Sequence, residues 1–221
     1  MKKIDFKILI ITVILCLIPI IFGISVYDQL PEEVAVHFDM NNNPNNFMTK
    51  QFAIFVIPAI MAVFQTILCI VIDLVNDKKE NKKFYIITKF ILPIIDIIVY
   101  SSIILYAINK PINIKLMACF IIGCVFLVFG NYSPKYEPNS REIKYYNRDV
   151  LRKENRILGY IMVILGILFI ICAFLPGGQY ATIILIITII LALILVVINI
   201  KLLIDNKKQR SMKKGGKIWL K

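Results

Sequence analysis

Charged residues and histidine are both scarce in this chain of 221 residues. Only 18% of the residues are charged and 59% are hydrophobic, whereas a soluble domain usually has about a quarter of its residues charged. His37 is the single histidine, which leaves no paired zinc ligands and no His-containing triad. We find no nucleophile elbow and no phosphate-binding glycine loop. We therefore expect no enzyme activity, no catalytic residues, no metal and no cofactor.

Cysteine is missing from the polar segments, where a disulfide framework or a zinc cluster would place it. All five cysteines fall inside apolar blocks: Cys16, Cys69, Cys119, Cys124 and Cys172. We interpret them as small hydrophobic side chains. The net charge of +12 is distributed in a way that fits membrane orientation better than nucleic-acid binding, so no nucleic-acid partner is expected.

Long uninterrupted apolar blocks are what the sequence has in abundance. A helix needs about 20 apolar residues to cross the hydrocarbon core of a bilayer. Six blocks reach that length, at residues 8–26, 52–75, 90–108, 112–129, 157–175 and 181–200. They predict an all-α fold, a polytopic membrane helical bundle of about six transmembrane helices with the lipid bilayer as its first partner.

Two connections between these blocks are short. Residues 109–111 (Asn-Lys-Pro) and 176–179 (Pro-Gly-Gly-Gln) each predict a tight turn, so the blocks on either side form antiparallel helical hairpins. Lys115, near the start of the fourth block, is expected to extend toward the nearby interface. The first block is longer than a usual signal-peptide core and lacks a clear cleavage site, so we expect it to remain as a span.

The lysines and arginines predict the orientation of the spans. Twenty-three of the 26 lie on one alternating set of segments: 1–7, 76–89, 130–156 and 201–221. Segments rich in Lys and Arg stay in the cytoplasm. Both termini of this multi-pass membrane protein are therefore predicted to be cytoplasmic.

The same pattern divides the chain into three expected parts. Residues 1–75 form a two-span N-terminal unit with an external loop at 27–51. Residues 84–204 form a four-span unit with a cytoplasmic loop at 130–156. Residues 205–221 form a basic cytoplasmic tail that would bind anionic lipid headgroups.

The predicted external loop carries a spaced set of residues: Leu30-Pro31, then His37-Phe38-Asp39, then Asn45, Phe47, Thr49 and Lys50. This set resembles the Leu-Pro…His-Phe-Asn…Gly…Pro-Asp…Trp…Ser-Lys signature of the small uncharacterised domain that begins SdpI-type bacterial immunity proteins. Phe47 replaces the usual tryptophan. Asn42 stands where that family usually has glycine, and asparagine is the next best residue at positive φ.

A second match lies in the predicted cytoplasmic loop. Gly130-Asn131-Tyr132-Ser133-Pro134-Lys135 and Pro138-Asn139-Ser140 resemble the Gly-Asn-Tyr-x-Pro-Lys…Pro-Asn-Ser segment of the same family. The family's next element, Gly-Ile-Arg-Thr-Pro-Trp-Thr, is absent. The resemblance implies a multi-pass protein of the bacterial cytoplasmic membrane that protects its producer against a secreted toxin. In the best-known members it also implies binding of a cytoplasmic autorepressor.

These matches, together with one intramembrane carboxylate, give the candidate residues for binding a ligand or partner. They are His37, Phe38, Asp39, Asn45, Phe47, Lys50, Asp96, Asn131, Tyr132, Pro134 and Asn139. For His37 two interpretations stay open, a structural bond to the backbone of its own loop and contact with a ligand. Two interpretations also stay open for Asp96. It either serves a function, or it is structural, with a hydrogen-bond partner such as Gln65 or Ser101 or with its carboxyl group kept neutral by burial.

Three hypotheses for the function follow. The first is an immunity protein whose external loop recognises a toxin. The second is a small transporter or accessory component that uses Asp96, and the third is a scaffold with no ligand of its own. The loop at 130–156 is either a solvated segment or a docking surface for a cytoplasmic protein, and from Asp149 onward it is expected to form an amphipathic helix leading into the fifth span.

Overall fold

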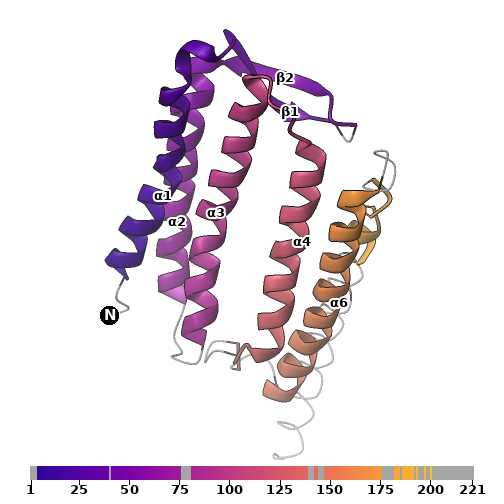
Figure 1. The fold of residues 1–221 in the computed structure, drawn as a ribbon. Helices are drawn as coiled ribbons and strands as arrows, with labels where there is room; N and C mark the ends of the chain where they lie inside the picture. Colours follow the sequence, from indigo (N-terminus) through magenta and orange to yellow (C-terminus); the bar gives the residue numbers. More distant parts are fainter. Residues whose placement is uncertain are drawn as a thin grey trace, which may run out of the picture.

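The computed structural model is a bundle of long helices with a short β-hairpin across one end (Figure 1). The structure describes residues 4–39, 41–75, 81–138, 142–143 and 147–175, and part of the segment 182–200. The main helices are α1 (Phe6–Ser25), α2 (Ile57–Val75), α3 (Lys82–Ala107), α4 (Ile114–Tyr132) and α6 (Arg148–Phe174). The shorter helical turns are η1 (Tyr27–Gln29), η2 (Phe52–Val56) and η4 (Ser133–Lys135).

Five of the helices are long and apolar enough to cross a bilayer. They confirm the predicted all-α, multi-pass membrane bundle and the first five predicted spans. The predicted sixth span at 181–200 is helical over Thr182–Leu191, and much of it lies outside the described residues, as does the turn at 176–179. Large apolar side chains such as Ile21, Val63 and Ile164 face outward and are more than half exposed, as a surface in contact with lipid requires.

Two helices begin several residues before the apolar blocks from which they were predicted. α3 begins at Lys82 rather than at residue 90, and α6 begins at Arg148 rather than at 157. Asn147 caps α6, because its side chain accepts a hydrogen bond from Asp149 N. The early start of α6 confirms the helix expected from Asp149 onward. Apolar content marks only the part of a helix in the hydrocarbon core, whereas the helix itself continues into the headgroup region.

The second span starts with a π-helical turn, η2, ahead of Pro58. Proline has no N–H, so Pro58 cannot donate to the carbonyl of Ile54. Ile57 N donates instead to the Phe52 carbonyl, which closes the wider π turn. The proline is therefore accommodated at the end of the helix that carries the hairpin.

The hairpin consists of β1 (Glu33–Phe38) and β2 (Pro44–Thr49), paired antiparallel. Sequence reasoning predicted a shaped loop here but no strands, because the segment is too rich in asparagine and too short to show a clear alternation. Val34 is fully buried and belongs to the same core cluster as residues of α3, so β1 packs on the helices. Beneath it lies a core cluster made of Leu30, Val34, Ala53, Ile54, Tyr100 and Ile104.

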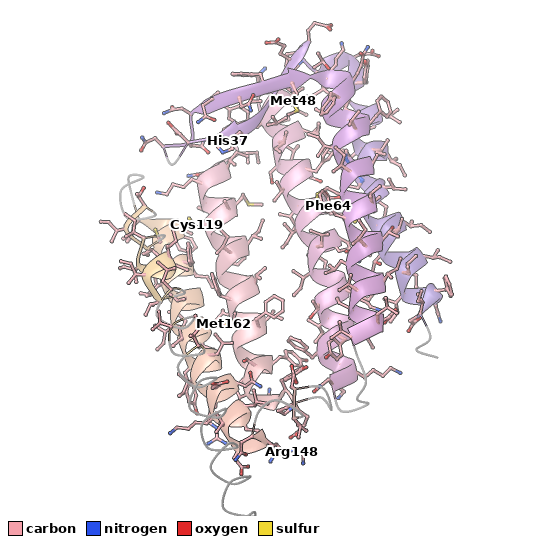
Figure 2. The ribbon with its side chains drawn as sticks, turned by 180° about the vertical axis from the view of Figure 1, so that it is seen from behind. His37, Met48, Phe64, Cys119, Arg148 and Met162 are labelled. Atoms are coloured by element: carbon pink, nitrogen blue, oxygen red, sulfur yellow. The ribbon has the colours of Figure 1, made fainter. Side chains whose placement is uncertain are left out.

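The helices form two groups below the hairpin (Figure 1). α1, α2 and α3 pack together in one group, and α4 packs closely against α6 in the other. The connection from α3 to α4 is the predicted tight turn, in which Asn109 adopts φ 58°. Figure 2 shows His37 at the hairpin end and Arg148 at the opposite end of the bundle.

Candidate functional site

The hairpin is seated on the ends of α3 and α4. Asn42, at its tip, has φ 70°, which confirms the positive φ expected at this position. Its Oδ1 accepts hydrogen bonds from Ile114 N at 2.7 Å and Lys115 N at 3.3 Å, at the N-terminus of α4. Phe38 packs edge-on against Tyr106 near the end of α3, with ring centroids 4.7 Å apart. The hairpin thus joins the two helix groups at this end.

The tip of the hairpin is shaped by Asp39. Its carboxylate accepts from Asn41 N, Asn43 N and Asn43 Nδ2 at 2.8, 2.8 and 3.0 Å. The hydrogen bond from the Asn43 backbone, followed by that from the Asn43 side chain, lowers the pKa of Asp39 below its ordinary value. Asp39 is therefore ionised at neutral pH and is engaged by its own turn.

His37 bonds across the hairpin to Asn45, with Nδ1 and Oδ1 2.5 Å apart. An amide oxygen only accepts, so Nδ1 carries the proton. The partner is therefore a side chain, whereas the structural interpretation of His37 predicted a backbone partner. His37 is an exposed residue, so its ring is accessible from the surface of the hairpin.

Lys50, which follows the last residue of β2, forms an ion pair. Its Nζ donates to Glu32 at 2.9 Å and lies 4.9 Å from the centroid of the Tyr27 ring. The hydrogen bond to Glu32 raises the pKa of Lys50 above its ordinary value. Among the hairpin candidates, Phe38, Asp39 and Lys50 are thus held by internal contacts, whereas the side chain of Phe47 is 48% exposed.

A seam of polar side chains runs between α1, α2 and α3. Its buried members in the described residues are Thr12, Gln65, Lys89 and Asp96. Thr12 Oγ1 lies 3.5 Å from Cys69 Sγ, which joins α1 to α2. Polar side chains buried between membrane helices hold those helices together because hydrocarbon offers them no alternative partner.

The strongest contact in the seam is one that sequence reasoning missed. Lys89 Nζ bonds Asp73 at 2.5 Å, with only 3% and 11% of the two side chains exposed. Asp73 also accepts from Asp5 N at 3.0 Å, so the pair ties α2 and α3 to the start of α1. In the sequence, Asp73 lies near the end of the apolar block 52–75, and Lys89 is the last residue of the predicted cytoplasmic segment 76–89. The signal that could have drawn attention to Lys89 is its spacing from Pro93 and Asp96, which places all three residues on one face of α3.

Pro93 explains the position of Gln65. The ring of Pro93 removes the N–H that would otherwise donate to the carbonyl of Lys89, one turn earlier in α3. Gln65 Nε2 donates to that carbonyl at 2.7 Å and to Cys69 Sγ at 3.2 Å. A side chain of α2 therefore satisfies the backbone group that the proline leaves open in α3.

Asp96 lies further along the same face of α3 and is 5% exposed. Within the described part of the chain, its Oδ2 has no hydrogen-bond partner. The expected bond to Gln65 is not formed, because the amide of Gln65 is engaged by Lys89 and Cys69. Tyr100, one turn on, faces α1, where a Cβ on Gly23 would lie 2.9 Å from its hydroxyl.

The opposite end of the bundle holds a pocket of about 340 Å³ between the two helix groups. Its lining residues are Val75, Phe84, Tyr85, Phe129, Ser133, Tyr136, Asn155, Leu158 and Met162. Ser133 Oγ donates to the Asn155 carbonyl at 2.9 Å, which joins η4 to α6. The pocket is largely aromatic and apolar, with a few polar groups at its wall.

The second set of candidate residues stands beside this pocket. Asn131 accepts from Lys135 Nζ at 2.9 Å, and the same ammonium lies 5.4 Å from the centroid of the Tyr132 ring. Pro134 sits against Gly159, where an added Cβ would lie 2.6 Å from the proline ring. These residues form one structural corner between α4 and α6. Asn139 lies outside the described residues.

The fold and these sites define a multi-pass helical membrane protein with a hairpin fixed across one end. A family model described as a domain of unknown function (DUF1648) matches residues 14–62, which include the second half of α1, the hairpin and the start of α2. The chain is also 24% identical over 192 residues to the immunity protein SdpI of Bacillus subtilis (strain 168), across 84% of this chain and 90% of that protein. No solved structure matches.

Both comparisons confirm the resemblance to SdpI-type immunity proteins. The relative is named an immunity protein and not an enzyme. The chain is therefore a multi-pass membrane protein that is similar to an immunity protein.

Proposed function

We propose that this protein protects the cell that makes it against a secreted toxin peptide that acts at the membrane. The supporting observation is the similarity to the immunity protein SdpI along nearly the whole of both chains. The hairpin is the proposed recognition site, and it is predicted to face outside. Its candidate residues are gathered on one element, and its tip is fixed by Asn42 to the start of α4, so it offers a partner a preformed surface.

Protection is tested by expressing the chain in a sensitive bacterial host. The host is challenged with secreted peptides encoded beside the gene, and growth is compared with that of cells carrying the empty vector. We expect survival at toxin concentrations that kill the control cells. Sensitivity unchanged toward every peptide would contradict the proposal.

His37 is tested with a matched pair of variants. Both His37→Ala and Asn45→Ala remove the same cross-strand bond, but only the first removes the imidazole. If His37 contacts the toxin, protection is lost in His37→Ala and kept in Asn45→Ala, at equal membrane levels. Equal protection by both variants assigns His37 a structural role.

The orientation of the hairpin is tested by labelling intact cells with a membrane-impermeant thiol reagent, in a variant whose five native cysteines are replaced by alanine or serine. A cysteine at Asn43 is expected to react and a cysteine at Asn139 is not. The opposite result would place the hairpin in the cytoplasm and remove it as a site for a secreted toxin.

A second role, binding of a cytoplasmic repressor, is favoured by the pocket beside Ser133. A partner side chain entering the pocket would be excluded by Met162→Trp, whereas Ile164→Trp adds the same bulk on the outer face of α6, where Ile164 is 58% exposed. We expect the first variant alone to release the repressor encoded beside the gene from the membrane fraction. Retention in both variants would contradict this role.

The alternative function, a small transporter, is favoured by one observation. Asp96 is buried, and its Oδ2 has no hydrogen-bond partner in the described residues, and an intramembrane carboxylate often marks a pathway. Purified protein in liposomes is tested for proton or sodium flux. Flux that disappears in Asp96→Asn supports transport, and flux that is absent or unaffected by Asp96→Asn contradicts it.

A further inference from the structure

The two strands of the hairpin differ in how they are covered. β1 packs on the helices through Val34, which is fully buried. In β2 the residues Asn45, Asn46 and Phe47 are all exposed. Among the residues that the structure describes, the sheet has only these two strands, so no further strand of that part covers the outer edge of β2.

The register shows which backbone groups point to that edge. Lys50 N donates to Glu32 O at 3.0 Å, which makes these two residues a hydrogen-bonded pair. Bonded and non-bonded pairs alternate along an antiparallel ladder. Thr49 opposite Glu33 and Phe47 opposite Ala35 are then non-bonded pairs. The N–H and C=O groups of Thr49 and Phe47 therefore point away from β1, toward the uncovered side.

The edge lacks the usual protection against pairing. Exposed edge strands normally carry a charged residue, most often lysine, or a proline that blocks a further strand. β2 has no charged residue, and its proline, Pro44, stands at the tip and leaves the part from Asn45 to Thr49 open. In this part Phe47 is 48% exposed, and Thr49 is the last residue of the strand.

The charges around the edge indicate what kind of strand it takes. The segment from Tyr27 to Lys50 has four carboxylates and a single ammonium, and that ammonium is already paired with Glu32. Glu33 is exposed and stands opposite Thr49, on the same face of the hairpin. A second copy of the chain would bring these carboxylates near their own equivalents, whereas a cationic strand would find opposite charges.

We propose that the outer edge of β2 binds a cationic peptide segment in extended form, which adds to the hairpin as a third strand. Backbone hydrogen bonds to Phe47 and Thr49 provide the pairing, the ring of Phe47 covers an apolar side chain, and Glu33 receives a lysine or arginine. This inference rests on the proposed function, because it names the chemistry by which the hairpin recognises a secreted toxin.

The test compares two substitutions of one residue. Phe47→Pro removes the outward N–H without disturbing the pairing with β1, since that N–H takes no part in it. Phe47→Ala removes the ring and keeps the N–H. The probe is a fluorescent synthetic peptide in which lysine and valine alternate, added to the full-length protein in lipid nanodiscs, with binding read by anisotropy.

We expect binding to fall by about tenfold in Phe47→Pro relative to Phe47→Ala, as the loss of one backbone hydrogen bond predicts. A version of the peptide with alternate amides N-methylated should not bind the wild-type protein, which tests strand addition without any change to the hairpin. A glutamate–valine peptide should bind more weakly than the lysine–valine peptide. Equal binding of the N-methylated or the glutamate peptide would overturn the inference.

The outcomes separate this inference from the proposed function. If the wild-type chain protects cells and Phe47→Pro protects them equally well, the inference is wrong and immunity stands. If the wild-type chain protects against no peptide but the nanodisc results hold, the edge binds cationic strands and the proposed function is wrong.

Discussion

The helices within each of the two groups are held together by different kinds of contact. Between α1, α2 and α3 the contacts are made by polar side chains, with Lys89 and Asp73 at one end and Gln65 above them. Between α4 and α6 the backbones themselves meet. A Cβ placed on Gly166 would lie 2.8 Å from the carbonyl oxygen of Gly123, and one on Gly130 would lie 2.9 Å from that of Gly159.

The difference reflects what a bilayer offers as a driving force. Lipid tails are as apolar as leucine, so burying apolar surface between helices gives little net stabilisation. Close backbone approach gains dispersion contacts, and buried hydrogen bonds gain electrostatic energy. The α4–α6 pair should therefore be sensitive to the size of a side chain, and the α1–α3 group to its polarity.

The largest expected effect comes from breaking the buried ion pair. Lys89→Met leaves the carboxylate of Asp73 buried without its counter-charge, which should lower the free energy of unfolding by about 3–5 kcal/mol. Thermal unfolding of the purified protein in detergent micelles measures the loss. Lys83→Met, which changes an exposed lysine on the same helix, is the matched control.

The double variant Lys89→Met/Asp73→Leu sharpens this result. It removes both charges, so most of the lost stability should return. If Lys89→Met costs no more than Lys83→Met, the pair is not buried in the way that the structure shows.

A side chain at the α4–α6 contact should have the next largest effect. Gly166→Leu forces the two backbones apart and should cost about 1–3 kcal/mol, as overpacking a close contact does. The control is Ala118→Leu, which adds three carbons to an exposed position of α4 and should leave the unfolding midpoint nearly unchanged. An equal effect of the two substitutions would mean that the helices are not in backbone contact.

A smaller effect tests the link between Gln65 and Pro93. Gln65→Leu should cost about 0.6–1.7 kcal/mol, the range of a hydrogen bond between membrane helices. In a Pro93→Ala background the alanine N–H can donate to the Lys89 carbonyl, so the same substitution should cost less. The four unfolding free energies form a double-mutant cycle. A cost that is identical in both backgrounds would contradict the explanation given for Gln65.

The sequence predicted the spans well because a helix in lipid needs an apolar block of fixed length. It predicted the turn at Asn109 and the positive φ of Asn42 for local reasons, since few residues tolerate those conformations. Both kinds of prediction depend only on neighbouring residues, and the structure confirms them.

The contacts between distant residues could not be predicted in the same way. Lys89 and Asp73 look like interfacial charges until the helices are placed side by side. The same holds for Asn42, whose side chain reaches a helix that begins 72 residues later in the chain. A partner at that separation is set by the packing of the whole bundle, which no local pattern records.

The smallest expected effect concerns the seat of the hairpin on α4. Asn42→Gly keeps the positive φ but removes the oxygen that caps Ile114 N, and Asn113 still caps Leu116 N, so the global cost should be only about 0.5–1 kcal/mol. The local effect is larger, because exchange of the Ile114 amide hydrogen with solvent should become roughly tenfold faster. Asn42→Ala should be less stable than Asn42→Gly by about 1–2 kcal/mol, because alanine tolerates φ 70° less well than glycine. Unchanged exchange in Asn42→Gly would show that the hairpin does not hold the two helix groups together.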